Sequence, residues 1–212
     1  MKVGTDGVLL GAWASIAGNP TSILDVGTGC GIIALMMAQR CPSANIQAID
    51  IETNAIAEAT ENFNNSPWPD RLTCSLFDAT DFAHATIQKF DLIISNPPFF
   101  AERTFAPDTS RAAARNQQSL SPEALFSAAA KLLSPEGSIC VIYPASLSPE
   151  ILAAASIAGL SPINVTDVIT KEGSAPSRTL WQFSKNYSCG QNYNQTITLR
   201  DDTGKPTDEY TS

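Results

Sequence analysis

Short apolar runs alternate with longer amphipathic segments along most of this chain. The short runs predict strands, and the longer segments, whose apolar positions recur every three to four residues, predict helices. Because the two kinds of element alternate, we expect a mostly parallel sheet with helices on both faces. The predicted strands span 22–26, 45–50, 72–77, 90–95 and 137–144, and the predicted helices span 31–40, 53–65, 123–133 and 148–159.

The starts of three helices carry typical N-cap residues. Asp6 is the expected cap of a first helix that closes at Gly18, and Ser121 and Ser148, each followed by proline, are the expected caps of two later helices. These residues predict where each helix begins.

The last third of the chain departs from strict alternation. Runs 163–170 and 177–185 are β-rich and have no helix between them, so we expect an antiparallel pair at the edge of the sheet. The fold prediction is therefore α/β, with a doubly wound, mostly parallel seven-stranded sheet. We expect one domain over 1–185 and a partly irregular extension of it over 186–212, ending in an acidic turn and a frayed terminus.

Composition fits one globular protein with a sizeable core. The chain has 212 residues, of which 43% are hydrophobic and 16% are charged. No apolar run approaches the roughly 18 residues of a membrane helix, and the N-terminus lacks the basic start and long apolar core of a signal peptide. We therefore expect a cytoplasmic protein without membrane contact.

The cysteine and histidine content argues against a metal site. The 5 cysteines are scattered without a C-x-x-C pair, and His84 is the 1 histidine. These residues provide neither a zinc-ligand spacing nor a disulfide framework. We expect no metal and no disulfide.

The net charge of −8 argues at first against a nucleic-acid partner, because phosphate binding normally needs a basic surface. The acidity is local, however. Residues 50–81 contain 7 acids and 1 base, Arg71, which leaves only about −2 for the remaining residues. A nucleic-acid partner therefore stays open.

The sequence DVGTGCG, residues 25–31, follows the first predicted strand. Ligands bind at the carboxyl ends of the strands in open α/β sheets, and glycines there let a ligand approach the backbone. Ile32 replaces the third glycine of a dinucleotide fingerprint, and the chain has no phosphate-binding G-x-x-x-x-G-K-[ST] loop. A nucleotide cofactor other than NAD or a nucleoside triphosphate is therefore favoured over an ordinary glycine turn.

Acidic residues follow the next two strands. Asp50 ends the second strand, where its carboxylate can accept both ribose hydroxyls of an adenosine, and Glu52 is the local competitor for that role. Asp78 follows the third strand and can accept from the adenine amino group, with Phe77 or Ala79 beside the ring. A solvated acidic surface explains Asp50 or Asp78 alone. It does not readily explain Asp25, Asp50 and Asp78 at three successive strand ends beside a glycine loop.

The fourth strand ends in SNPPF, residues 95–99. Two prolines stop any ladder or helix, and they hold Asn96 in an extended conformation. Turn formation alone is one explanation of this sequence. The alternative is a rigid platform that presents polar acceptors to a substrate.

Taken together and in this order, DVGTGCG, AID, FDA and NPPF resemble the motifs of class I S-adenosylmethionine-dependent methyltransferases over roughly residues 1–185. MKVGTDGVLLGAW with NPPFF resembles, more narrowly, the bacterial tRNA1(Val) (adenine-37-N6)-methyltransferases. The resemblance implies a Rossmann-like methyltransferase fold and S-adenosylmethionine as cofactor, with S-adenosylhomocysteine as product. It implies a cofactor site made of Thr5, Asp6, Asp25, Gly27, Gly29, Gly31, Asp50, Ile51, Phe77, Asp78 and Asn96, and a catalytic motif made of Asn96, Pro97, Pro98 and Phe99.

The resemblance gives NPPF a chemical role. The exocyclic nitrogen of adenine is a poor nucleophile because its lone pair is delocalised into the ring. We expect the Asn96 side-chain oxygen and the Pro97 carbonyl oxygen each to accept a hydrogen bond from one of its two N–H groups. We expect Phe99 to stack on the base. The resemblance implies tRNA as the partner, with no DNA and no obligate protein partner. An anticodon-loop base is unpaired or easily splayed out, so the cost of extruding it is modest.

Residues 100–120 form a long connection with three arginines, Arg103, Arg111 and Arg115. Long connections in compact domains are often functional, so we expect RNA phosphate contacts here, with help from Lys2. The alternative is a short surface helix with solvated arginines. Relatives usually carry further residues before MKVGTDG and after EYTS, which predicts that RNA-binding surface extends beyond both ends of this sequence.

Three other functions fit the same motifs. Asn-Pro-Pro-aromatic suits the amide nitrogen of a protein glutamine, and it also suits a guanine-N2 methyltransferase of ribosomal RNA. A non-catalytic cofactor-binding or RNA-binding module is the third alternative, and the intact NPPF sequence argues against it.

Overall fold

The computed structural model describes residues 4–98, 120–186 and 194–211. Within these residues one sheet of 8 strands runs in the order β3-β2-β1-β4-β5-β7-β6-β8. The α/β fold is confirmed, but the predicted count of seven strands is wrong. The strands are β1 (Ser22–Val26), β2 (Asn45–Asp50), β3 (Leu72–Leu76), β4 (Phe90–Ser95), β5 (Leu133–Pro144), β6 (Ser161–Ile169), β7 (Arg178–Ser184) and β8 (Asn194–Thr198).

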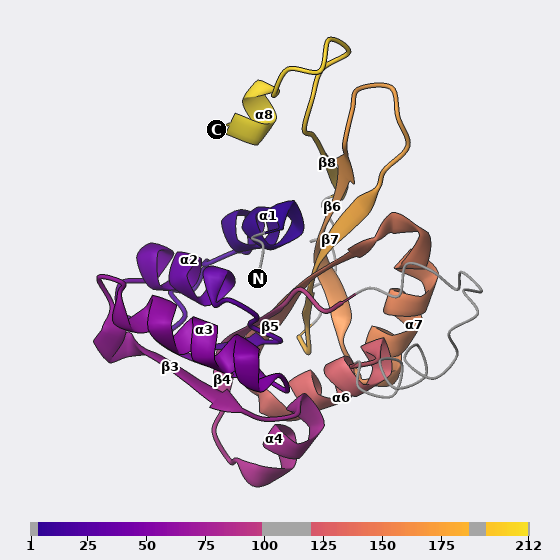
Figure 1. Cartoon of the computed structure of the whole chain (residues 1–212). Helices are drawn as coiled ribbons and strands as arrows, with labels where there is room; N and C mark the ends of the chain where they lie inside the picture. Colours follow the sequence, from indigo (N-terminus) through magenta and orange to yellow (C-terminus); the bar gives the residue numbers. More distant parts are fainter. Residues whose placement is uncertain (1–3, 99–119, 187–193, 212) are drawn as a thin grey trace, which may run out of the picture.

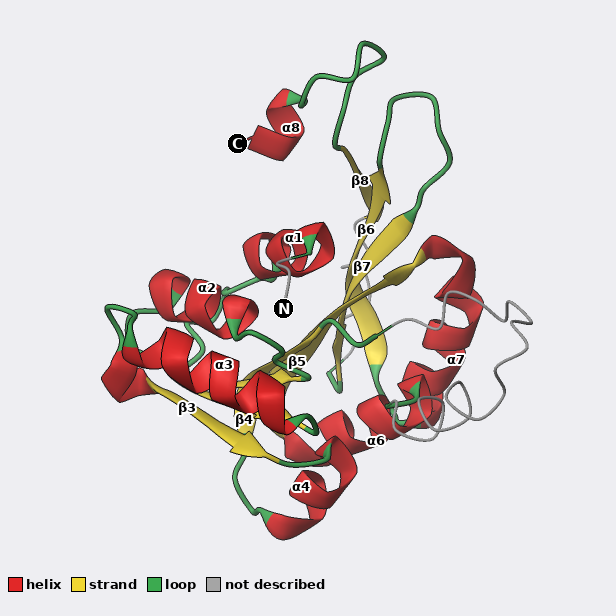
Figure 2. Cartoon of the chain, viewed as in Figure 1, coloured by secondary structure: helices red, strands yellow, loops and turns green. Residues whose placement is uncertain are grey.

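Helices cover both faces of the sheet (Figure 2). Helices α1, α2 and α3 lie on one face, and α4, α6 and α7 lie on the other (Figure 1). The helices are α1 (Thr5–Trp13), α2 (Ile32–Arg40), α3 (Thr53–Asn64), α4 (Ala79–Ala85), α6 (Pro122–Leu132), α7 (Ser148–Ile157) and α8 (Asp208–Thr211), with single 3-10 turns at Pro69–Arg71 and Ala145–Leu147. No helix among the described residues has both the length and the apolar content to cross a membrane.

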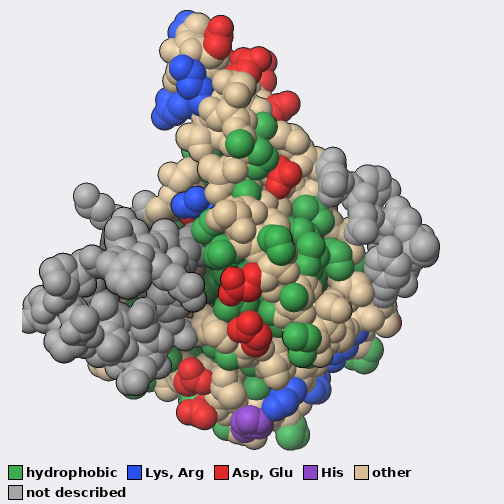
Figure 3. All heavy atoms as spheres, turned by 90° about the vertical axis from the view of Figure 1, so that its right-hand side faces the viewer, with side chains coloured by type: hydrophobic (Ala, Val, Ile, Leu, Met, Phe, Trp, Pro, Cys, Tyr) green, Lys and Arg blue, Asp and Glu red, His purple; other side chains and the backbone are tan. Residues whose placement is uncertain are grey.

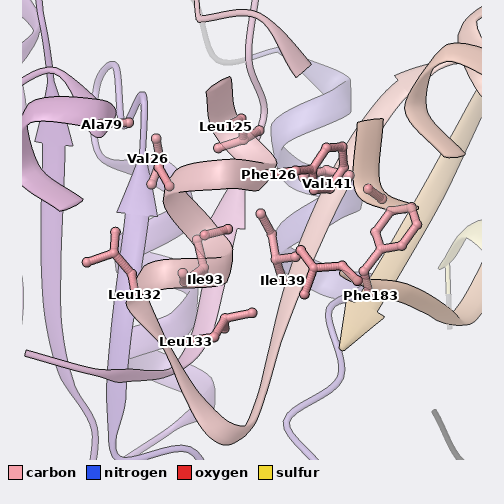
Figure 4. Close-up of a cluster of buried hydrophobic side chains, with 14 of the residues drawn as sticks. Val26, Ala79, Ile93, Leu125, Phe126, Leu132, Leu133, Ile139, Val141 and Phe183 are labelled. Atoms are coloured by element: carbon pink, nitrogen blue, oxygen red, sulfur yellow. The ribbon is translucent and has the colours of Figure 1, made fainter. Parts of the chain in front are cut away.

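The first five strands are parallel, as predicted. β1 pairs with β2 and β4, β2 pairs with β3, and β4 pairs with β5. Apolar side chains of α6 meet those of β4, β5 and β7 in one core cluster (Figure 4), where the Phe126 and Phe183 rings lie 5.1 Å apart, edge to face. Because the strands are parallel, their carboxyl ends share one edge of the sheet.

β5 begins earlier than predicted. It starts at Leu133, which pairs with Phe90, and its register shifts before Ser138. A side chain at Gly137 would place its Cβ 2.7 Å from the Phe90 carbonyl oxygen, so glycine permits the close approach of the two strands. The sequence Ser-Pro-Glu-Gly is typical of a turn, so the start of β5 could not be predicted as a strand.

The antiparallel prediction is confirmed, but its position at the edge is wrong. β7 pairs antiparallel with both β5 and β6, and β8 pairs parallel with the outer side of β6. The edge strand is therefore β8, which was missed because Asn194–Thr198 follows a polar stretch. Beyond it the described residues end in α8, which packs near β8, and the Glu209 carboxylate accepts from the Thr198 amide at 3.0 Å.

Helix α1 is held by contacts distant in sequence. It ends at Trp13 rather than Gly18, and Trp13 Nε1 donates to Thr166 Oγ1 of β6 at 2.9 Å. Arg40 Nη1 donates to the carbonyls of Gly11 and Ala14 at 2.7 and 2.8 Å, which satisfies the carboxyl end of the helix. These bonds fix α1 against α2 and β6.

Two of the three predicted caps are wrong. Ser121 accepts from the Ala124 amide at 3.2 Å, as expected. Asp6 lies in the first turn of α1 instead of capping it, and Ser148 Oγ donates to the Ala145 carbonyl at 2.8 Å. The Asp6 carboxylate instead accepts from Arg178, far along the chain, and the Ser148 hydroxyl bonds to the preceding turn.

Candidate active site at the carboxyl edge of the sheet

Four adjacent strands bring the predicted motifs together. The amides of Gly27 and Thr28 donate to the Ile49 carbonyl at 2.8 and 3.1 Å, and the Phe77 amide donates to the Asp50 carbonyl at 3.0 Å. These bonds join the ends of β1, β2 and β3. On the other side of β1, Ser95 Oγ of β4 donates to the Val26 carbonyl at 2.8 Å.

The glycine loop needs left-handed backbone at three positions. The φ angles of Gly27, Gly29 and Gly31 are 72°, 57° and 82°. A Cβ on Gly31 would lie 2.5 Å from the Phe63 ring, so Gly31 serves packing against α3. A Cβ on Gly27 would meet no atom within 4 Å, so this glycine faces open space above the loop.

Asp25 lies beneath the loop. Its side chain is fully buried, and its Oδ2 accepts from Thr28 Oγ1 at 2.6 Å and from the Ala34 amide of α2 at 3.2 Å. Burial raises the pKa of Asp25 to about 7. Its Oδ1 is buried without a hydrogen-bond partner among the described residues. The carboxyl group therefore joins the loop to the start of α2.

Asp50, in contrast, is only half-buried at the end of β2. Its Oδ2 accepts from the Gly29 amide and its Oδ1 accepts from the Glu52 amide, both at 2.9 Å. Each carboxylate oxygen can accept a second hydrogen bond. Glu52 is exposed and contributes its backbone to this arrangement, so the geometry favours Asp50 as the ligand-binding acid.

Exposed apolar side chains flank the acids at the ends of β2 and β3. Ile51 is 44% exposed and Phe77 is 40% exposed, which is unusual for such residues. The Phe77 and Phe82 rings pack edge to face, with centroids 5.5 Å apart, so Phe82 holds the Phe77 ring in position. Asp78 Oδ1 caps α4 by accepting from the amides of Thr80 and Asp81 at 2.7 and 3.2 Å.

The NPPF sequence begins at the next strand end. Asn96 is half-buried, Pro97 is buried and Pro98 is exposed. Helix α1 lies beside them, since a Cβ on Gly7 would be 3.6 Å from Asn96 Nδ2. Phe99, and with it Lys2, Arg103, Arg111 and Arg115, lies outside the described residues.

Thr5 and Asp6 line a pocket together with Arg178. Asp6 Oδ2 accepts from Arg178 Nε of β7 at 2.8 Å, and Thr5 is exposed. The proximity of Gly7 to Asn96 and the pairing of Asp6 with Arg178 were both missed, because each joins segments far apart in sequence. Among the described residues, no group of three or more His, Cys, Asp or Glu could hold a metal ion.

Comparison with known families agrees with this geometry. The family model of the methyltransferase small domain matches residues 8–157. A tRNA1(Val) (adenine(37)-N6)-methyltransferase of Phocaeicola vulgatus is 46% identical over 183 residues, which cover 86% of this chain and 76% of the relative. The chain belongs to the family of tRNA1(Val) (adenine(37)-N6)-methyltransferases, within the methyltransferase small domain proteins. A second member, from Citrobacter koseri, is 42% identical over 87% of this chain and 75% of its own.

Solved structures confirm the fold of the family. The structure of a predicted O-methyltransferase from Agrobacterium tumefaciens has a TM-score of 0.73 at 18% identity, covering 98% of this chain and 96% of its own. A TehB-like S-adenosylmethionine-dependent methyltransferase from Corynebacterium glutamicum has a TM-score of 0.53 at 17% identity, covering 87% and 89%. The predicted Rossmann-like methyltransferase fold is confirmed.

Proposed function

We propose that the protein transfers a methyl group from S-adenosylmethionine to the exocyclic N6 of adenine 37 in tRNA1(Val). The observation that carries this proposal is the position of Asn96 and Pro97 beside the glycine loop, at the end of the strand next to β1. Membership of a family whose relatives carry that name supports the substrate.

The cofactor site fits S-adenosylmethionine. The open space above Gly27 allows backbone contact, and Asp50 retains acceptor capacity on both oxygens for two ribose hydroxyls. Ile51 and Phe77 offer exposed apolar surface to an adenine ring, with Asp78 beside them. When bound, S-adenosylmethionine supplies a methyl group activated by a positively charged sulfur.

Asp25, Gly29 and Gly31 support this site from within the protein. Asp25 is fully buried and bonds Thr28 and Ala34, so it positions the loop rather than contacting a ligand through its bonded oxygen. Gly29 donates its amide to Asp50 and thereby orients that carboxylate. Helix α1 borders the site through Gly7, which lies next to Asn96, whereas Thr5 and Asp6 line a separate pocket with Arg178.

Asn96 and Pro97 activate the substrate nitrogen. The Asn96 Oδ1 atom and the Pro97 carbonyl oxygen accept the two N–H bonds of the adenine amino group, which favours a pyramidal nitrogen with an available lone pair. Positive charge develops on this nitrogen during transfer, and acceptors already in place stabilise it without reorganisation. The buried Pro97 ring keeps both acceptors fixed, and the extra proton on the methylated nitrogen passes to solvent water, which restores neutrality.

Phe99, which follows the exposed Pro98 and lies outside the described residues, stacks on the target base in this proposal. Lys2, Arg103, Arg111 and Arg115 contact tRNA phosphates.

The test is transfer of a labelled methyl group to total RNA and protein from a strain that lacks this protein, followed by nucleoside and amino-acid analysis. Label in N6-methyladenosine of tRNA is the expected result. Label in protein glutamine or in guanine of ribosomal RNA would replace the proposed substrate. Asn96→Ala should abolish the label, whereas Asn54→Ala, at an exposed position of α3, is the matched control and should keep it.

A further inference from the structure

A pocket of about 290 Å³ lies on the side of α1 opposite Asn96. It is bordered by the first turns of α1, the end of β6, the start of β7 and the segment that follows β8. Figure 1 shows α8 above α1, with β6, β7 and β8 beside them. The catalytic motif described above uses none of this space.

Two guanidinium groups line the pocket. Arg178 donates from Nε to Asp6 and from Nη1 to the Ser177 carbonyl at 3.0 Å, so its position is fixed. Arg200 is exposed, and its Nη1 donates to the Gly204 carbonyl at 2.8 Å. A guanidinium carries five N–H donors in a fork that matches phosphate.

The remaining lining suits a sugar and a base. Leu9, Val168 and Leu199 provide an apolar floor, and Tyr210 adds an aromatic ring that is 40% exposed. Hydroxyl groups of three further residues border the same space: Thr5, Thr170 and Ser177. Aromatic, hydroxyl and guanidinium groups around one hollow are the combination that holds a single nucleotide of RNA.

We propose that this pocket holds a nucleotide of the substrate RNA close to the target adenine, with its phosphate on Arg178 and Arg200 and its base on Tyr210. The proposal rests on the proposed function, since it takes the RNA substrate from there. One helix separates the pocket from Asn96, because Gly7 faces Asn96 while Asp6 faces Arg178. A helix diameter of about 10 Å corresponds to about three stacked nucleotides.

Acids near the pocket offset part of its positive charge. Asp6 lines the pocket and forms an ion pair with Arg178. The Glu209 carboxylate accepts from the Thr198 amide, and Asp201 accepts from Thr203 Oγ1 and the Lys205 amide at 2.7 and 2.9 Å, so these two carboxylates keep their charge but are oriented toward their own segment. Arg200 donates to the neutral carbonyl of Gly204 and is therefore the less neutralised of the two guanidinium groups.

A second basic cluster, at the opposite edge of the sheet, lacks these features. Lys89 and Lys131 lie beside His84, and Lys131 Nζ is 2.7 Å from His84 Nε2. Lys89 already donates to the Lys131 carbonyl. Figure 3 shows the histidine with basic side chains beside it at the lower edge of the molecule.

The experiment measures equilibrium binding of an unmodified tRNA transcript to the full chain at several salt concentrations. Arg200→Ala should weaken binding about tenfold, as expected for one charge-assisted contact, and should reduce the salt slope by about one. Tyr210→Leu should weaken binding about fivefold with an unchanged salt slope. Lys205→Ala removes the same charge from the same exposed turn but lies outside the pocket, so its effect should stay below about twofold.

Methyl transfer to the same tRNA is measured in parallel. Equal binding by wild type, Arg200→Ala and Tyr210→Leu would overturn the pocket, even if wild type methylates tRNA fully. Pocket-dependent binding without methyl transfer by wild type would support the pocket and contradict the proposed function alone. A wild type that binds no tRNA would contradict both.

Discussion

Two glycines of the same loop should fail in different ways when each is changed to alanine. Both Gly27 and Gly31 have left-handed backbone, so alanine costs about 1–2 kcal/mol of folding free energy at either position. At Gly31 the new Cβ would also lie 2.5 Å from the Phe63 ring, and Phe63 is buried. Overpacking of this kind costs about 1–3 kcal/mol more. Gly31→Ala should therefore destabilise the protein by about 2–5 kcal/mol.

Gly27→Ala should instead affect ligand binding. Its Cβ would point into open space, where the proposed cofactor lies, so stability should fall by only about 1–2 kcal/mol. Affinity for S-adenosylmethionine should fall about tenfold or more, which corresponds to about 1.4 kcal/mol or more. Urea unfolding and calorimetric titration measure the two quantities separately.

A double-mutant cycle tests the cause assigned to Gly31. Phe63→Leu shortens the side chain that the new methyl group would meet, so Gly31→Ala should cost less in the Phe63→Leu background than in wild type. Equal costs in the two backgrounds would show that the ring contact is not the cause. Equal losses of stability for Gly27→Ala and Gly31→Ala would refute the distinction between the two glycines.

Three further changes address other parts of the molecule. Asn96→Ala should abolish methyl transfer while leaving cofactor affinity almost unchanged, and Asp50→Ala should weaken cofactor affinity; a reversed result in the same calorimetric and transfer assays would refute the site assignment. Arg71→Ala should lower the free energy of unfolding by about 2 kcal/mol in urea titrations, because its guanidinium donates to the carbonyls of Ala38, Cys41 and Ala44 at 2.8, 3.1 and 2.8 Å. Asp25 has a pKa of about 7 in the folded protein, above its ordinary value of 3.8, so the folded state binds the extra proton between these pH values and the stability from this group falls as the pH rises from about 4 to about 7. Asp25→Asn should remove that loss, and urea midpoints that keep the same pH dependence in wild type and Asp25→Asn would contradict it.

The parallel half of the sheet could be predicted because its information is local. Each of β1, β2 and β4 is an apolar run whose interior is buried on both sides, and the glycine loop and Asn96 follow such runs directly. The carboxyl edge, and with it most of the candidate site, follows from that alternation alone.

Contacts between distant segments could not be predicted in the same way. Aspartate is a typical N-cap residue, which led to the prediction for Asp6. Its actual partner, Arg178, lies 172 positions later. β8 is polar because an edge strand is held chiefly by backbone bonds to β6, so its sequence carries little apolar signal. Asp25 and Asp50 both sit near strand ends, and only the structure separates the buried carboxyl from the accessible one.

The uneven arrangement of charge across the sheet bears on the RNA substrate that we propose. The 7 acids of residues 50–81 belong to the part of the chain that carries β2, α3, β3 and α4, at one end of the strand order. Arg178 and Arg200 belong to β7 and to the segment after β8, at the other end. Repulsion of phosphates is strong over β2 and β3, whereas Arg178 and Arg200 partly offset the nearby acids Asp6, Asp201 and Asp202 beside α1 and β6. The RNA path that we propose therefore passes the pocket lined by the two arginines, which α1 separates by one helix diameter from Asn96.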